Sequence, residues 1–165
     1  MRSLTDREVA KYFHRSYKAV DGLWFMKVEA KHGFKAALEM DEEVWKVMPK
    51  IQARMIKSML GKESGEVTFL ESLKVKLSLE GFTFKVEQDS TGFRIIINDC
   101  PWHNLMVKSG REELSRLVGT TICRVEYSVW ISEFCEKLHF TFGAQKCHGS
   151  EQCILDFRNS EFHAH

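Results

Sequence analysis

The first eighty residues repeat apolar positions with the three-to-four-residue spacing of an α-helix. Thr5 and Glu8 predict a capping box at the start, in which each side chain binds the backbone N–H of the other residue. Gly22 is expected to bend or split this first helix, and Gly33 is expected to end it. The apolar positions of the first helix are Val9, Tyr12, Phe13, Tyr17, Val20, Trp24 and Val28.

A second helix is expected from about Asp41, which is a favourable N-cap residue, to Gly61. Pro49 lies inside this pattern and predicts a kink, because proline removes a helical hydrogen bond. The spacing assigns the inner face of this helix to Val44, Met48, Ile51, Met55 and Met59. The next segment, 68–81, fits both a strand and a helix, but its first four residues form another capping box, which favours the helix.

From residue 82 onward the apolar period changes to two, which is typical of strands. Segments 82–88 and 93–99 flank the turn sequence DSTG and predict a β-hairpin. A helical region follows and ends with a predicted helix over 120–138. Segments 139–145 and 152–159 then predict two more short strands.

This order of elements predicts an α+β fold, because the spacing of strands and helices contains no βαβ unit. We expect N-terminal helices over about 5–81, packed on an antiparallel sheet built from two hairpins over about 82–159. Composition is consistent with a single domain spanning 1–165, since 44% of the residues are hydrophobic and can form a sizeable core.

Net charge narrows the range of partners. Lys plus Arg number 24 and Asp plus Glu number 23, so the net charge is +1 and no basic field favours nucleic acid or a membrane surface. The N-terminus is charged and is not followed by an apolar signal segment, and no apolar run is long enough to cross a membrane. We therefore expect a cytoplasmic protein without nucleic-acid or membrane partners.

The five cysteines are expected to be free or metal-bound in the cytoplasm rather than paired in disulfides. Four of them could converge at one end of the sheet: Cys100, Cys123, Cys147 and Cys153. Thiolates suit zinc, yet the spacings match no strong zinc signature, and free cysteine often only fills core space. A thiolate nucleophile beside His103 or His148 is a further reading, although no thiol-protease signature is present. Cys135 projects to the polar face of its helix.

Glu126 is the most informative charge in the sequence. It falls inside the apolar arc of helix 120–138, between Ile122 and Trp130. An inward carboxylate is costly without a partner, so Glu126 is expected to meet a cation, a metal, a buried donor or a ligand. Near the N-terminus, Asp21 and Glu29 flank Phe25 and could line a polar pocket beside Trp24, or form a solvated helix edge.

Residues 21–60, DGLWFMKVEAKHGFKAALEMDEEVWKVMPKIQARMIKSML, resemble the N-terminal signature of an uncharacterised prokaryotic family. That family is related to the L-2-amino-thiazoline-4-carboxylic acid hydrolase-like proteins. The second half agrees in order, with Cys-Pro-Trp at 100–102, GREE at 110–113, Cys123 followed by Glu126 and Tyr127, and a late Cys153. The resemblance implies an α+β fold similar to vinyl-4-reductase and nitric-oxide-sensor domains, with a small-molecule pocket, a homodimer, and a metal or reactive-thiol site.

Together these features predict a metal-binding protein, with zinc or iron held by Cys100, Cys123 and Cys153 and by Cys147 or Glu126 as the fourth ligand. The pocket is assigned to Asp21, Trp24, Glu29, Trp102, Tyr127 and Trp130. If the protein is an enzyme, metal-activated water would hydrolyse a small cyclic or amide-like substrate with Glu126 as general base. The alternative is a non-catalytic module that senses a small molecule or redox state.

Overall fold

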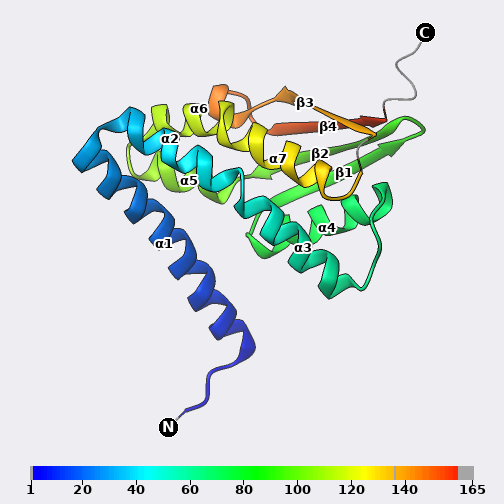
Figure 1. The fold of residues 1–165 in the computed structure, drawn as a ribbon, viewed down its shortest axis with the longest axis horizontal. Helices are drawn as coiled ribbons and strands as arrows, with labels where there is room; N and C mark the ends of the chain where they lie inside the picture. The colour runs from blue at the N-terminus through cyan, green and yellow to red at the C-terminus, as the bar shows by residue number, and fades with distance from the viewer. Residues whose placement is uncertain (1, 136, 160–165) are drawn as a thin grey trace. The chain divides into compact units, whose positions relative to one another are not determined.

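The computed structural model describes residues 2–135 and 137–159 (Figure 1). The chain divides into two compact units, residues 1–44 and 45–165. Helices and an antiparallel sheet make the mixed α+β fold that the sequence predicted. None of the described helices is long and apolar enough to cross a membrane.

The first unit contains α1 (Asp6–His32) and most of α2 (Phe34–Trp45). The predicted capping box is confirmed, because Thr5 Oγ1 accepts from the Glu8 N–H at 3.3 Å and Glu8 Oε2 accepts from the Thr5 N–H at 2.9 Å. Gly22 was wrongly expected to break the helix, and α1 runs through it, since one glycine costs a helix only about 1 kcal/mol. Gly33 ends α1 with φ of 87°.

The region expected to form one kinked helix forms α2 and α3 (Met48–Leu60), so the predicted boundaries are wrong. Asp41 lies inside α2 rather than at an N-cap. Pro49 lies in the first turn of α3, where proline is tolerated because no helical N–H bond is needed there.

The predicted inner face of this region is also wrong. Large apolar residues assigned to it are exposed, namely Val44, Ile51, Met55 and Met59. The buried residues of α3 are Pro49, Ala53 and Ile56. Ile51, Met55 and Met59 all lie within α3, which instead turns Ala53 and Ile56 toward the core.

Segment 68–81, whose pattern fitted both a strand and a helix, is largely helical and lies in α4 (Glu66–Leu79), so the predicted helix is confirmed. The capping box predicted at its start is wrong, because the helix begins two residues before Thr68, after Gly65. Thr68 is instead one of the buried residues of α4, as are Phe69, Leu70, Leu73 and Leu77.

Four strands form one antiparallel sheet in the order β1-β2-β4-β3. The strands are β1 (Thr83–Asp89), β2 (Gly92–Asp99), β3 (Leu138–Ala144) and β4 (Cys153–Asn159). Both predicted strand pairs are confirmed, and the pairing of β2 with β4 joins them into one sheet. Between the two pairs lie α5 (Pro101–Lys108), α6 (Glu112–Thr120) and α7 (Ile122–Ser132), and a short 3-10 helix, η1 (Lys146–His148), precedes β4.

One face of the sheet forms the core with α3, α4 and α7. Phe93 of β2 stacks on Phe157 of β4 with ring centroids 4.9 Å apart, and Phe69 of α4 packs edge-on to Phe157 at 5.2 Å. The alternation of strand side chains sends these rings to one face and polar residues to the other. The apolar arc expected for this helix is confirmed in α7, since Ile122, Tyr127 and Trp130 are buried.

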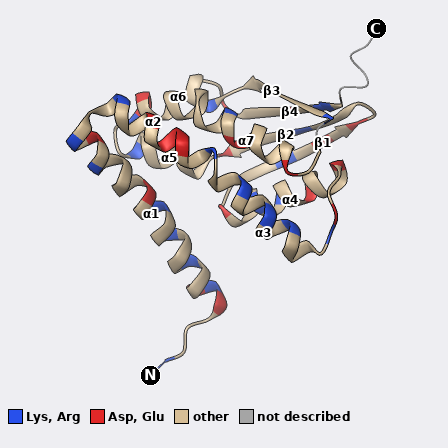
Figure 2. Ribbon diagram, in the orientation of Figure 1, with Lys and Arg blue, Asp and Glu red and all other residues tan. Residues whose placement is uncertain are grey.

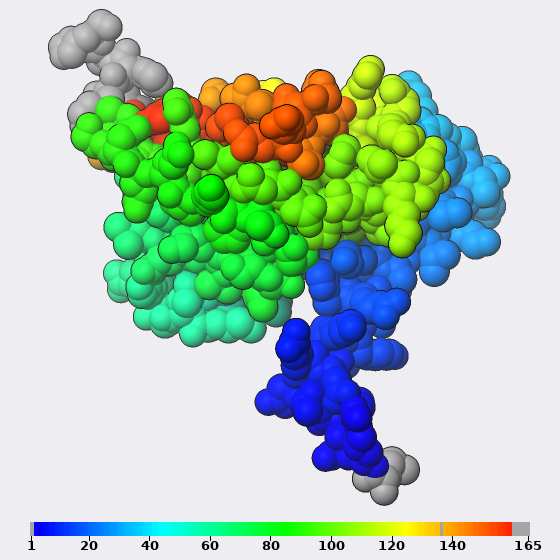
Figure 3. Space-filling view, turned by 180° about the vertical axis from the view of Figure 1, so that it is seen from behind, coloured from blue at the N-terminus to red at the C-terminus, as the bar shows by residue number. Residues whose placement is uncertain are grey.

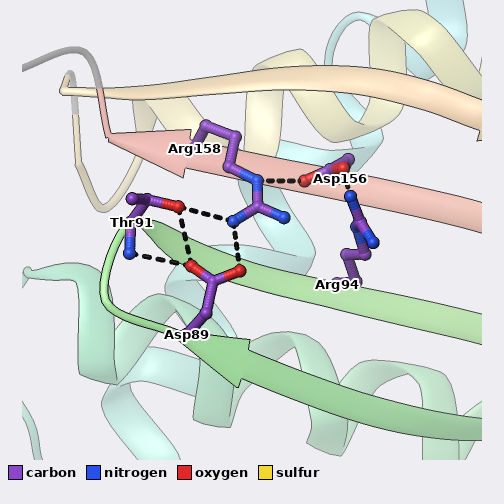
Figure 4. Close-up of polar contacts among 5 residues, drawn as sticks. All are labelled: Asp89, Thr91, Arg94, Asp156 and Arg158. Carbon is purple, nitrogen blue, oxygen red and sulfur yellow. Dashed lines mark hydrogen bonds and ion pairs between the residues drawn. The ribbon is translucent and has the colours of Figure 1, made fainter. Parts of the chain in front are cut away.

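The opposite face of the sheet carries charged side chains (Figure 4). Arg158 of β4 donates to Asp89 Oδ2 at 2.6 Å and to Thr91 Oγ1 at 2.7 Å, while Arg94 donates to Asp156 at 2.8 Å. Seen from behind, β4 lies beside the hairpin on the molecular surface (Figure 3). These contacts link the hairpin turn to β4 where the strands pair.

Gly92 should tolerate alanine poorly. Its φ is +155°, and an added Cβ would overlap the Phe157 carbonyl oxygen across the sheet. We expect Gly92→Ala to lower the free energy of unfolding by about 3 kcal/mol or more, measured by urea denaturation. Gly149→Ala is the control, since Gly149 also has a positive φ but open space around it, and should cost about 1 kcal/mol. Equal losses would show that the close approach of the strands is unimportant.

Candidate functional site

Two cysteines lie at the same end of the sheet, one directly after β2 and one at the start of β4. Cys100 follows β2 directly, caps α5, and accepts a hydrogen bond from the His103 N–H at 3.5 Å. Cys153 begins β4, pairs in register with Ile97 of β2, and accepts from the Lys146 N–H at 3.2 Å. The turn into α5 and the start of β4 therefore hold both sulfurs in place through backbone donors.

The other two cysteines of the predicted set come from α7 and from the 3-10 helix η1. Cys123 lies in the first turn of α7. Cys147 lies against α6, where a Cβ added at Gly119 would overlap its sulfur, so Gly119 leaves room for this side chain.

Contacts bring these segments together at one end of the sheet. Cys147 lies against Gly119, four residues before Cys123, and the Lys146 N–H beside Cys147 donates to Cys153. Burial raises the pKa of the Cys123 thiol well above its usual range, and Glu126, Cys100, Cys147 and Cys153 also disfavour its ionisation.

These thiols are poor nucleophiles as they stand. Burial raises the pKa of Cys100 and of Cys147 to about 11, so both are neutral at pH 7. The histidines proposed as activating bases bond to hydroxyls instead. His103 Nδ1 lies 2.8 Å from Ser115 Oγ, and His148 Nε2 lies 3.1 Å from Thr120 Oγ1. The arrangement therefore gives no support to thiolate catalysis.

Cysteine thiols are suitable ligands for zinc or iron, but the side chains of these four cysteines do not form a coordination shell in the structure. Within residues 2–135 and 137–159, no three His, Cys, Asp or Glu side chains converge closely enough to hold a metal ion. Cys135, which was expected on a polar helix face, lies beyond the end of α7 and packs, half-buried, against the core.

Next to the cysteines lies a buried cluster of charges. Glu126 of α7 is buried, as the sequence predicted. Its partner is Lys76 of α4, whose side chain is only 2% exposed and whose Nζ lies 2.6 Å from Glu126 Oε1. The same Nζ lies 3.1 Å from Glu80 Oε2, one helical turn along α4. We define Lys76, Glu80 and Glu126 as the charge cluster.

Lys76 is the residue that sequence reasoning missed. A signal was available, because Lys76 lies three residues after Leu73 and seven after Phe69, on the buried face of α4. A lysine on that face, four residues before Glu80, indicates a buried ion pair.

Two neutral donors complete the charge cluster. Gln52 Nε2 of α3 donates to Glu80 at 3.2 Å, and Trp102 Nε1 of α5 donates to Glu80 at 3.5 Å. Trp102 was assigned to a pocket, and its indole nitrogen here serves as a donor to a buried carboxylate. Side chains from α3, α4, α5 and α7 thus meet at three buried charges.

The charge cluster has one ammonium and two carboxylates. Burial opposes the charged form of Lys76, but Glu126 and Glu80 together outweigh it and raise the pKa of the ammonium. Burial also raises the pKa of Glu126, Glu80 adds to this, and Lys76 offsets it only in part.

The remaining predicted pocket residues fall into two groups. Tyr127 and Trp130 fill core space, because the Tyr127 ring packs 5.3 Å from Phe140 and Trp130 stacks on Phe134 at 5.8 Å. Asp21, Trp24 and Glu29 lie on α1 in the first unit. Trp24 is exposed there.

A model of a family of unknown function, DUF6125, matches residues 6–157. The chain belongs to this family. No curated protein and no solved structure matches it. The DUF6125 match extends from α1 into β4 and so includes the charge cluster and the four cysteines.

Removing the single cation of the charge cluster should destabilise this DUF6125 chain severely. We expect Lys76→Met to lower the free energy of unfolding by about 3–5 kcal/mol, because two buried carboxylates lose their ammonium. Lys74→Met, at an exposed position of the same helix, should change it by less than about 0.5 kcal/mol. Urea denaturation measures both, and similar losses would contradict a buried ion pair.

The raised pKa of Glu126 should make the free energy of unfolding depend on pH. A carboxyl with a raised folded pKa stabilises the fold fully below its unfolded value of 4.5, and this contribution is lost as pH rises through the folded pKa. Glu126→Gln should therefore flatten the decline of stability above about pH 4.5. Urea titrations at a series of pH values test this, with Glu63→Gln at an exposed position as control. Unchanged slopes in Glu126→Gln would contradict the raised pKa.

Proposed function

We propose that this protein is a cytoplasmic binding module that takes up zinc or iron through Cys100, Cys123, Cys147 and Cys153. The observation that carries this proposal is the placement of four cysteines from four separate segments at one end of the sheet, where the Lys146–Cys153 and Cys147–Gly119 contacts link them. Thiols that follow β2 and lie in α7, η1 and β4 are the soft ligands that these metals favour. All five cysteines are free, as expected in a reducing compartment.

Metal uptake in this proposal requires side-chain movement and loss of protons. The sulfurs do not converge as placed, so rotation of the thiols and adjustment of η1 would have to bring them together. Thiols with a pKa of about 11 bind metal only on deprotonation, so metal affinity should increase with pH. A bound divalent cation would also offset the negative charge of Glu126 near Cys123 and Cys100.

Sensing fits the charge cluster better than catalysis does. A general base has to accept a proton from the reacting group, whereas the Glu126 carboxylate is held against Lys76 in the protein interior. The ion pair therefore favours a non-catalytic role, in which metal or redox state changes the packing at this end of the sheet. We also propose that the module binds a small molecule, and that its fold is similar to vinyl-4-reductase and nitric-oxide-sensor domains.

Hydrolysis is the second candidate, and one observation favours it. The pKa of Glu126 is raised, as in many carboxylates that act as general bases near neutral pH. Glu126 could then activate water toward a small cyclic or amide-like substrate, as the resemblance to the thiazoline carboxylic acid hydrolase-like proteins suggests. A bound metal would supply Lewis-acid activation of that water.

Metal content tests the proposal directly. Protein purified without added metal should carry about one zinc or iron per chain by elemental analysis, or take up one on zinc titration. Cys123→Ser should abolish binding and Cys135→Ser should retain it, since Cys123 lies at the start of α7 and Cys135 lies beyond the opposite end of that helix. Thermal melts check that both variants fold. Failure of folded wild type to bind metal, or equal losses in both variants, would overturn the proposal.

A further inference from the structure

Helix α1 presents a long exposed apolar face. Seven large apolar side chains between positions 9 and 26 are 38% to 67% exposed. They are Val9, Tyr12, Phe13, Val20, Leu23, Trp24 and Met26. We call these residues, with Ser16 and Ala19 between them, the α1 stripe.

The α1 stripe is continuous and contains no charge. At about 100° per residue it covers roughly 160° of the helix surface, from Met26 through Ser16 to Trp24. At the same spacing, the charged residues of this part of α1 project outside that arc, namely Lys11, Arg15, Lys18 and Asp21. Figure 2 shows charged positions recurring along the ribbon of α1 between uncharged ones.

A different side of α1 already packs within the first unit. Phe25 is buried and lies edge-on to Phe34 of α2, with ring centroids 6.0 Å apart. Phe25 projects roughly 180° away from the centre of the α1 stripe, so its packing on Phe34 leaves the stripe uncovered within the first unit. An amphipathic helix normally buries its apolar face against a neighbour.

The size of the α1 stripe suits a protein interface. Val9 to Met26 spans roughly 26 Å of helix. The exposed fractions correspond to apolar surface on the order of 800 Å², about what each partner contributes to a standard interface. An apolar patch of this size on a soluble domain marks an interaction site.

We propose that the α1 stripe pairs antiparallel with the α1 stripe of a second copy of this chain. Three pairs of stripe residues are equidistant from the midpoint between Tyr17 and Lys18, namely Val9 and Met26, Tyr12 and Leu23, and Ser16 and Ala19. Antiparallel pairing about this point brings Val9 against Met26 and Tyr12 against Leu23 at the two ends. Ser16 meets Ala19 at the centre, where small side chains let two helices approach closely.

Two local features bear on this pairing. A shallow hollow along one edge of the α1 stripe is lined by Tyr12, Ser16 and Ala19 of the stripe and by the charged residues Glu8, Lys11 and Arg15 beside it, so polar side chains border the apolar face there. The antiparallel arrangement also places Phe13 beside Val20 and Trp24 of the second copy, and such aromatic contacts stabilise interfaces.

This interface does not depend on the proposed metal site, so either can fail alone. Light scattering of the full chain over a wide concentration range should show a dimer. Val20→Glu should raise the dimer dissociation constant at least about tenfold, because it buries a charge twice in the interface. Val67→Glu is the matched control, since both valines lie in helices and are 67% and 72% exposed. A monomeric wild type, or equal effects of the two substitutions, would overturn the proposal.

Cross-linking tests the partner and its orientation. The photo-reactive residue p-benzoylphenylalanine at position 13, in a mixture of isotope-labelled and unlabelled chains, should cross-link to residues 20–24 of the other chain. Cross-links to residues 45–159 would overturn the proposal, because another part of the chain would then cover the stripe. Flotation of monomeric protein with phosphatidylcholine–phosphatidylglycerol vesicles would overturn it in favour of a membrane surface.

Discussion

The ion pairs of Lys76 with Glu126 and Glu80 are the interaction on which the second unit depends. A buried ammonium is unfavourable alone, and so is each buried carboxylate, so each of these residues requires the others. Lys76 and Glu80 lie on α4, Glu126 lies on α7, and neutral donors reach Glu80 from α3 and α5. The charge cluster therefore specifies how α3, α4, α5 and α7 pack together. Apolar contacts alone are less directional and specify such packing less well.

The same charges set the chemistry of the neighbouring thiols. Glu126 raises the pKa of Cys123 and of Cys100, in addition to the effect of burial. Burial and the nearby carboxylate therefore favour the protonated, unreactive form of both thiols. At the proposed metal site, a bound cation would favour their deprotonation.

Apolar surface is distributed differently in the two units. In the second unit the aromatic rings of both central strands and of α4 lie in the core, while Arg158, Asp89 and Arg94 cover the opposite face of the sheet (Figure 4). In the first unit, α1 buries Phe25 but exposes a larger apolar stripe. The exposed stripe is the surface on which the proposed contact with a second copy of the chain rests.

Local signals in the sequence determined much of this protein. The capping box at Thr5, the hairpin around residues 90–91, the antiparallel strand pairs and the inward direction of Glu126 all depend on residues close together in the chain. Periodicity and capping report such features, because each is set by the geometry of one helix or one turn. The inward Glu126 also implied that a partner exists.

The identity of that partner was decided only by the tertiary structure. Lys76 lies fifty residues before Glu126, and periodicity within one helix gives no information on which helix faces it. The pairing of β2 with β4 and the exposure of Ile51, Met55 and Met59 are also long-range outcomes. An apolar spacing shows that a helix has an apolar face, but only packing among distant segments decides whether that face is buried.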